Sequence, residues 1–497
     1  MDVDLRGVVD GLGEPRLLVV GDLMLDRFTR GVADRVSPEA PVLVLRPDGE
    51  GAQPGGAARV AAAVRALGAA VRLAGAVGDD ADGRALVGLL EQAGVDCQAV
   101  VIAADRPTTT KERLTAAAGG GDPVPLLRID RESRAPLPGP AAGRLAGRLR
   151  QPLAECDAVL VADHGKGVCQ PELLAELLAA AAARDVPALV DPAHGADPDR
   201  YRGAAALLPN RTEAAAILGR EPADVAAGRA AASRLLARTG VAAVLLKLDR
   251  DGLVLATREQ RLIHYPSRAR VVRDVTGAGD VVLAAAGLCR AGGTGWEAAA
   301  AVATVAAAVA VERPCIRLPS RAEMRLRLVR DGGAAGKVVG LDELDVLMGR
   351  YRAAGLRVAL TNGCFDLLHA GHAAHLADAA ALADVLVVAV NGDAGVRRLK
   401  GAGRPVVPER DRAALVAALG CVDHVLLFDD HTPHPVLRRL RPDVLVKGGD
   451  YSPDQVVGRE LVEGYGGRVA VTRRHGSLST TRLIDEVLHR SPLGGAD

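Results

Sequence analysis

The 497-residue chain has little lysine, little asparagine and few aromatic residues. Arginine carries nearly all of its positive charge, since only six of the 62 basic residues are lysine, at positions 111, 166, 247, 337, 400 and 447. Asparagine occurs three times, at positions 210, 362 and 391. In a composition that avoids these two residues, each one that remains is a candidate for a specific role. All three asparagines and most of the lysines fall in the glycine-rich or strand-end stretches described below.

The sequence also lacks a long apolar run, a paired-cysteine motif and an excess of charge of one sign. Its longest uncharged apolar run, Ala298 to Val311, is fourteen residues long, which is too short to cross a bilayer. The N-terminus lacks the apolar core of a signal peptide, so a cytoplasmic protein is expected. Seven cysteines without a CxxC pair indicate reduced thiols rather than a disulfide framework or a zinc site. The net charge of +1 does not favour nucleic acid or an anionic membrane as a partner.

Between residue 16 and about residue 318, short runs of branched apolar residues alternate with long alanine-rich segments. This alternation is typical of α/β proteins and predicts a doubly wound sheet. Polar residues follow the apolar runs directly, and the carboxyl ends of parallel strands form the edge at which such sheets bind ligands. We therefore expect these residues to converge on one crevice. They are Asp22, Asp163, Asp191, Asn210 and Lys247.

Two stretches, residues 28–50 and 95–134, alternate apolar and polar residues and contain more proline. They predict a small β lid over the crevice. Between them, Pro54-Gly-Gly-Ala-Ala58 begins an alanine-rich helix. Its two glycines, Gly55 and Gly56, permit a close approach of the backbone to a ligand.

The stretch Asp274-Val-Thr-Gly-Ala-Gly-Asp280 is followed directly by an apolar run that predicts a helix. Gly277 and Gly279 let the backbone turn tightly, and the positive end of the helix faces the same spot, so the turn is suited to bind phosphate. Asp280 places a carboxylate beside this anion hole. That pairing is needed to take a proton from a hydroxyl while a phosphoryl group transfers to it. The alternative is a glycine turn whose aspartate only caps the helix.

A charged, glycine-bearing stretch separates this part from a second domain. We expect domains at residues 1–325 and 351–497, joined by a linker and a leading helix at residues 326–350. In the second domain, apolar runs again end in polar residues, which predicts a second, smaller doubly wound sheet. These residues are Thr361, Asn362, Asn391 and Lys447. Two ligand-binding edges indicate two active sites.

The segment Phe365-Asp-Leu-Leu-His-Ala-Gly-His372 introduces a helix of the second domain. His369 and His372 are three residues apart with a glycine between them, so both imidazoles can lie at a helix N-terminus and face a phosphate. Nucleotidyl transfer needs such donors, because charge develops on the α-phosphate as pyrophosphate departs. A metal-binding histidine pair is the alternative, although no third cysteine, histidine or carboxylate lies at ligand spacing.

Downstream residues offer more cations and hydroxyls. Lys400 and Lys447 can hold triphosphate oxygens, and the hydroxyls of Ser479 and Thr480, at a further predicted helix start, can cap a nucleotide. The alternative for each lysine is a solvated surface charge.

These motifs together resemble two known families joined head to tail. Residues 16–318 resemble the ribokinase-like carbohydrate kinases through Gly55-Gly-Ala-Ala58, Asn210-Arg-Thr-Glu213 and Thr276-Gly-Ala-Gly-Asp280. Residues 355–490 resemble the HxGH nucleotidyltransferases of the cytidylyltransferase type. The order of the two halves resembles the bifunctional enzymes of ADP-heptose biosynthesis.

The resemblance implies two ATP-dependent reactions. The N-terminal half would phosphorylate D-glycero-β-D-manno-heptose 7-phosphate at C1, with Mg²⁺, to give the 1,7-bisphosphate. The C-terminal half would transfer AMP from ATP to heptose 1-phosphate, giving ADP-heptose and pyrophosphate. The partners implied are sugar phosphates, ATP and a second copy of the chain, bound through the lid of the kinase domain.

The resemblance also implies a role for each motif residue. Asp280 would be the catalytic base beside the anion hole, and His369 and His372 would serve the adenylyl transfer. The anion hole would be Gly277, Ala278 and Gly279, and the ATP region Asn210, Arg211, Thr212 and Glu213, with Glu213 at the metal. The sugar would be bound by Asp22, Asp26, Gly55 and Gly56, and its phosphate by Lys111, Arg113 or Arg128. The nucleotide of the second site would be bound by Thr361, Asn362, Lys400, Lys447, Ser479 and Thr480.

The chain departs from the kinase family at two positions. Arg59 stands where the family has asparagine, and Ala193 stands where it often has lysine. Both positions belong to the predicted sugar crevice. Two alternatives therefore stay open: a kinase for another phosphosugar fused to a CTP- or GTP-dependent transferase, and a degenerate, sugar-sensing kinase domain on an active transferase.

Overall fold

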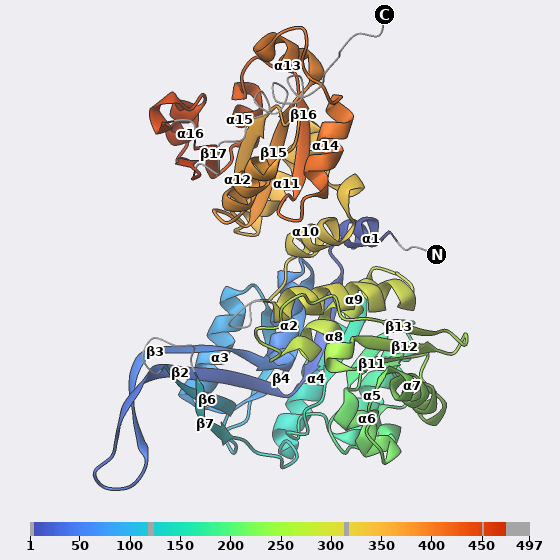
Figure 1. Ribbon diagram of the computed structural model, residues 1–497. Coiled ribbons are helices and arrows are strands. Elements are labelled where there is room, and N and C mark those ends of the chain that lie inside the picture. Colours follow the sequence, from blue (N-terminus) through green and yellow to red (C-terminus); the bar gives the residue numbers. More distant parts are fainter. Residues whose placement is uncertain (1–3, 118–123, 313–317, 450–451, 474–497) are drawn as a thin grey trace, which may run out of the picture. The chain divides into compact units, whose positions relative to one another are not determined.

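The computed structural model describes residues 4–117, 124–312, 318–449 and 452–473. The chain divides into two compact units, Met1–Met324 and Arg325–Asp497 (Figure 1). Each unit has its own sheet with helices packed against it.

In the described part of the first unit, nine strands form one sheet in the order β13-β12-β11-β10-β9-β8-β1-β4-β5. The strands from β11 to β5 in this order pair in parallel, whereas β12 and β13 pair antiparallel at one edge. Their bounds are β1 Arg16–Gly21, β4 Ala70–Val77, β5 Asp96–Ile102, β8 Ala158–Ala162, β9 Ala188–Asp191, β10 Ala206–Leu207, β11 Ala243–Lys247, β12 Leu253–Thr257 and β13 Leu262–Tyr265.

Helices cover both faces of this sheet, so its central strands are buried on both sides and read as continuous apolar runs. Val159 and Val161 of β8 belong to a core that includes α4, α5 and α7. Leu160 points to the other face, where its side chain contacts the helix α8 at Gly287. The helices are α1 Leu5–Gly11, α2 Ala57–Ala66, α3 Ala81–Gln92, α4 Gly139–Glu155, α5 Pro171–Ala182, α6 Arg211–Leu218, α7 Val225–Thr239, α8 Ala278–Ala291 and α9 Trp296–Val311.

A second sheet of four described strands forms the lid, in the order β3-β2-β6-β7, and extends from the main sheet in Figure 1. Its strands are β2 Leu23–Val36, β3 Leu43–Gly56, β6 Thr109–Ala117 and β7 Val124–Arg131. The predicted lid segment 95–134 is wrong at its start. Residues Asp96–Ile102 form β5 of the main sheet, because they pair in parallel with β4 and bury Ala99 and Val101 in the core.

The second unit contains a smaller parallel sheet, with the described strands in the order β16-β15-β14-β17-β18. The strands are β14 Val358–Gly363, β15 Val385–Asn391, β16 His424–Phe428, β17 Val444–Lys447 and β18 Arg468–Val471. The helices are α11 Leu341–Ala353, α12 Ala370–Ala380, α13 Asp393–Lys400, α14 Glu409–Ala418, α15 His434–Leu440 and α16 Arg459–Gly464, and α10, Arg321–Asp331, contains the boundary between the units. The prediction of two α/β sheets and a β lid is confirmed.

Among the described residues, no helix is long and apolar enough to cross a membrane. The six cysteines in the described ranges are free thiols.

Candidate active sites

Each sheet reverses its strand order beside its first strand, and ligands bind at such a switch point in open α/β sheets. In the first unit, β1 lies between β4 and β8, so the chain winds outward in both directions from it. In the second unit, β14 lies between β15 and β17. The predicted site residues follow the carboxyl ends of these strands.

The predicted anion hole forms the start of α8. Gly277 is the N-cap residue and has φ = 74°, a left-handed conformation that favours glycine. Asp280 lies in the first helical turn and is only 8% exposed. Burial raises the pKa of its carboxyl group above the usual value, although Arg59 and Lys247 oppose this effect. A carboxylate with a raised pKa at a glycine turn has the properties of a general base.

Asp26, predicted to contact the sugar, is buried and lies between two arginines. One of its oxygens pairs with Arg59 of α2, and the other lies 3.2 Å from Nη1 of Arg113 on the lid strand β6. The structure therefore brings together residues of α2 and of the lid strands β2 and β6 at the edge of the crevice.

Asp22, also predicted to contact the sugar, anchors a loop instead. Its carboxylate accepts backbone hydrogen bonds from His164, Lys166 and Val168 at 2.9 to 3.0 Å. These bonds hold the loop after β8 against β1. Its contact with the sugar stays a prediction that this geometry does not favour.

The predicted substrate-binding glycines lie where β3 meets α2. An added Cβ at Gly55 would come within 2.9 Å of the carboxylate of Asp26. One at Gly56, where φ is 54°, would come within 2.6 Å of the carbonyl oxygen of Asp22. Both positions therefore require glycine for close packing beneath the crevice.

The three predicted phosphate-binding cations of the lid share one face. Lys111 and Arg113 are two residues apart on β6, and Arg113 lies opposite Arg128 in the register of the neighbouring antiparallel strand β7. Side chains at such positions project from the same side of a sheet. Arg128 also forms two hydrogen bonds to Asp130, at 2.9 and 3.0 Å, which neutralises part of its charge.

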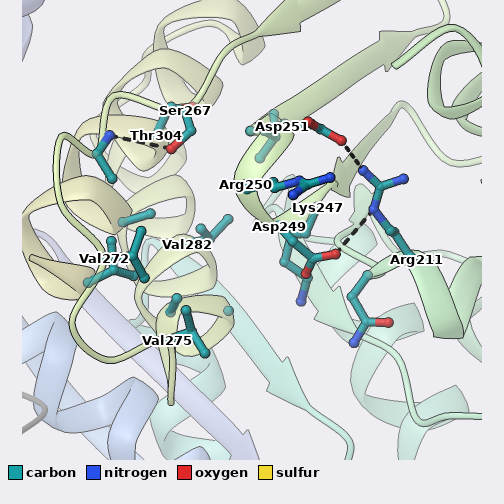
Figure 2. A pocket seen from close by; sticks show the side chains of 18 of the residues that line it. Arg211, Lys247, Asp249, Arg250, Asp251, Ser267, Val272, Val275, Val282 and Thr304 are labelled. Atoms are coloured by element: carbon teal, nitrogen blue, oxygen red, sulfur yellow. Dashed lines mark hydrogen bonds and ion pairs between the residues drawn. The ribbon is translucent and has the colours of Figure 1, made fainter. Parts of the chain in front are cut away.

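A pocket of about 940 Å³ opens beside the glycine turn. Figure 2 shows valine side chains at Val272, Val275 and Val282 on one side and charged side chains on the other. Asn210, Arg211, Ala278 and Gly279 line it, as does Lys247. An apolar wall opposite charged groups suits a molecule with a flat apolar part and an anionic tail.

The predicted ATP-region residues form the cap of α6. The side chain of Asn210 accepts from the backbone N–H of Glu213 at 2.9 Å, and Glu213 accepts from the backbone N–H of Asn210 at 2.7 Å. Thr212 donates its hydroxyl to Asn210, and Arg211 binds Asp249 and Asp251 at the rim of the pocket. Burial raises the pKa of Glu213 to about 7.

Lys247 is the residue of this site that sequence reasoning underestimated. Its ammonium group lies 2.7 and 2.8 Å from the two oxygens of Asp191, and 3.3 Å from an ideal Cβ at Gly279. The lysine scarcity was a signal, but only the fold places Lys247 beneath the turn. A cation is thus present at this edge although Ala193 carries none.

In the second unit, His369 and His372 lie at the start of α12, where His369 is the N-cap residue. Their rings stack with centroids 3.8 Å apart, and within the described residues neither Nδ1 atom has a hydrogen-bond partner. Burial lowers the pKa of both imidazoles, to about 4 for His372, which also lies near His369 and His375. Two neutral imidazoles with free nitrogens at a helix N-terminus can donate to phosphate oxygens.

Other predicted residues of this site gather at the ends of β14 and β17. Lys447 donates to the side chain of Asn362, and burial lowers its pKa to about 8. Thr361 is fully buried, and its hydroxyl lies 3.0 Å from Nε2 of His375. Lys400 is exposed at the end of α13. Ser479 and Thr480 lie outside the described residues.

No sequence pattern pointed to Arg412, which is fully buried beneath this site. Its guanidinium donates to the carbonyl oxygens of Cys364, Asn391 and Val407 and to the carboxylate of Asp393. It therefore joins the ends of β14 and β15 to the start of α13.

We expect Arg412→Met to destabilise the second unit by about 3–5 kcal/mol, because it leaves a carboxylate and buried carbonyls without their donor. Chemical unfolding of the full chain, with the two units followed separately, measures this change. Arg410→Met, at an exposed position of the same helix, is the control. Equal stability of the two variants would contradict this role.

The comparisons with known proteins cover both units. Residues 14–322 match the pfkB family of carbohydrate kinases, and residues 360–486 match the cytidylyltransferase-like family. The chain is 43% identical over 472 residues to the bifunctional protein HldE of Geobacter metallireducens, with 95% of each chain covered. It is 42% identical over 488 residues to HldE of Caulobacter vibrioides, with 97% of this chain and 99% of the relative covered.

Solved structures show the fold of the first unit. It is similar to the ribokinase of Arabidopsis thaliana in complex with ribose and ATP, at a TM-score of 0.51 and 20% identity, over 63% of this chain and 99% of the other. Phosphofructokinase-2 of Escherichia coli gives the same TM-score at 21% identity, over 63% and 97%.

These matches confirm the prediction of an ATP-using sugar kinase fused to a nucleotidyltransferase. The chain belongs to the HldE family of bifunctional proteins, in which a pfkB-type carbohydrate kinase precedes a cytidylyltransferase-like domain.

Proposed function

We propose that the first unit phosphorylates heptose 7-phosphate at its C1 hydroxyl, and that the second unit converts heptose 1-phosphate and ATP into ADP-heptose and pyrophosphate. The observation that carries the proposal is the presence of two separate sites, each with a glycine turn or helix start suited to phosphate, in a chain of this family. A phosphatase must remove the 7-phosphate between the two steps, because the kinase product is a bisphosphate.

In the kinase reaction, Asp280 accepts the proton of the C1 hydroxyl as its oxygen attacks the γ-phosphorus of ATP. The new O–P bond forms, the bond to the β-phosphate oxygen breaks, and ADP leaves. The amides of Gly277, Ala278 and Gly279 and the ammonium of Lys247 stabilise the charge on the transferring group. Asp26 orients the sugar, and Lys111, Arg113 and Arg128 bind its 7-phosphate.

Mg²⁺ enters this proposal as the partner of the ATP phosphates. The described residues contain no group of three histidine, cysteine or carboxylate side chains that could hold a metal ion alone. Mg²⁺ does not need such a group, because it is commonly held by one or two carboxylates together with substrate phosphates and water. Glu213 is the carboxylate for this role, and the ion would neutralise phosphate charge.

In the second reaction, an oxygen of the sugar 1-phosphate attacks the α-phosphorus of ATP and pyrophosphate leaves. His369 and His372 donate hydrogen bonds to the phosphates, and Lys447, Lys400, Thr361 and Asn362 hold the nucleotide, with Ser479 and Thr480 as further hydroxyls. No nucleophilic side chain is needed.

Mass spectrometry of the products tests this function. ATP and heptose 7-phosphate should give the 1,7-bisphosphate, and addition of a phosphatase that removes the 7-phosphate should give ADP-heptose. The purified chain should prefer ATP to CTP or GTP in pyrophosphate release. A chain that makes ADP-heptose from heptose 1-phosphate but never the bisphosphate would support the degenerate kinase domain instead.

We also propose that two copies associate through the lid. Five apolar side chains on or beside the lid strands β2, β3 and β7 are each more than half exposed, which is an unusual apolar content for the free surface of a small sheet: Val36, Val42, Leu43, Val124 and Leu127. Leu127→Asp should reduce the sedimentation coefficient to that of a monomer. An unchanged oligomeric state in this variant would exclude the lid as the interface.

A further inference from the structure

Arg59 is a buried arginine at the centre of the kinase crevice. It lies in the first turn of α2 and is only 3% exposed. Its Nε donates to the carbonyl oxygen of Pro54 at 3.1 Å, and its guanidinium pairs with the carboxylate of Asp26. Its Nη1 lies 3.9 Å from Oδ2 of Asp280. One cation therefore contacts the predicted sugar-binding carboxylate and approaches the predicted base.

The glycine turn fixes the guanidinium in this place. An ideal Cβ at Gly277 would lie 2.2 Å from Nη1 of Arg59 and 2.6 Å from its Cδ. The side chain therefore packs directly against the turn that we propose as the anion hole, and only a glycine leaves it room.

Asp26 also links Arg59 to the lid. Its second oxygen is 3.2 Å from Arg113, a residue of β6, so the two oxygens of one buried carboxylate pair with two different elements. A buried carboxylate keeps a fixed orientation only while its partners are present. The planar guanidinium suits this bridging better than an ammonium, because its donors point in several fixed directions.

We propose, on the basis of the proposed kinase function, that Arg59 is a positioning residue of phosphoryl transfer, which fixes the carboxylate of Asp26 towards the sugar and supplies a permanent positive charge beside Asp280. The sugar is then held where its C1 hydroxyl meets an ionised base. Arg59 thus connects sugar recognition at β2 with proton transfer at α8.

Four charged or titratable groups face Asp280, each from a different element, and three of them oppose the effect of burial on its pKa. Burial raises the pKa of Asp280, whereas His164, Arg59 and Lys247 lower it and Asp191 raises it further. Arg59 is the cation from α2. The others come from the loop after β8, from the end of β11 and from the end of β9. Loss of Arg59 should therefore move the titration of Asp280 to higher pH.

The test compares Arg59→Met with Arg59→Lys in the full chain, by measuring kcat and KM for heptose 7-phosphate from pH 5 to pH 9. We expect Arg59→Met to lower kcat/KM by about 100-fold and to shift the acidic limb of the kcat profile upward by about one pH unit. Arg59→Lys keeps the charge, so its acidic limb should stay in place. Its KM should rise about tenfold, because an ammonium cannot reproduce the fork that orients Asp26.

Arg65→Met, an exposed position of the same helix, is the matched control and should behave as the wild type. Adenylyl transfer by each variant verifies that the second unit is intact. A variant Arg59→Met with unchanged KM and an unchanged acidic limb, altered only in its thermal unfolding, would overturn the proposal, and so would an Arg59→Lys variant whose limb shifts like that of Arg59→Met. If Arg59→Met does not fold, Arg59→Gln replaces it with the same expected shift. A wild-type chain that phosphorylates no sugar phosphate contradicts the proposed function itself.

Discussion

Asp280→Asn is expected to reduce phosphorylation of the sugar phosphate by about 10³-fold or more, with adenylyl transfer unchanged. The variant keeps the shape of the side chain but cannot accept the proton of the attacking hydroxyl. The carboxyl group is buried and its pKa is raised, so it becomes protonated at a higher pH than an ordinary aspartate. The kinase activity of the wild-type chain should accordingly decline as the pH falls through the pKa of Asp280, because protonation removes the base.

Initial rates of ADP formation and of pyrophosphate release, measured on the same preparation, separate the two activities. Asp105→Asn, in the exposed turn between β5 and β6, changes the same chemical group away from the crevice and should leave both rates intact. Loss of both reactions in a folded Asp280→Asn chain would mean that the sites are not independent. Full kinase activity in this variant would remove Asp280 as the base.

The second large effect is expected at the histidine pair. His369→Ala and His372→Ala should each lower adenylyl transfer by about 10²–10³-fold, because each removes a donor that stabilises charge on the phosphates of ATP. The kinase rate should be unchanged. Loss of a transition-state contact predicts a fall in kcat greater than any change in KM for ATP.

His431→Ala is a suitable control, since this histidine is exposed in the loop between β16 and α15. Single-turnover rates distinguish slow chemistry from slow product release. Retention of more than half of the wild-type rate in both histidine variants would argue against their role in catalysis.

The sequence already contained the local chemistry of this protein. The glycine turn before Asp280, the capping residues Asn210 and Glu213 and the histidines at 369 and 372 could all be identified, because tight turns and helix starts depend on neighbouring residues. The alternation of apolar runs and alanine-rich helices likewise predicted the two sheets. Strand edges were less certain: β5 alternates like a lid strand, and only its pairing with β4 assigns it to the main sheet.

The tertiary structure decided which of these residues meet and which merely support the fold. Asp22 looked like a sugar ligand, yet its carboxylate is occupied by the backbone of a loop more than 140 residues later. Lys247, Arg59 and Arg412 acquire their surroundings only when distant strands and helices pack together. A charged side chain in water says little about its function, whereas a buried charge must find partners, and the identity of those partners depends on the whole fold.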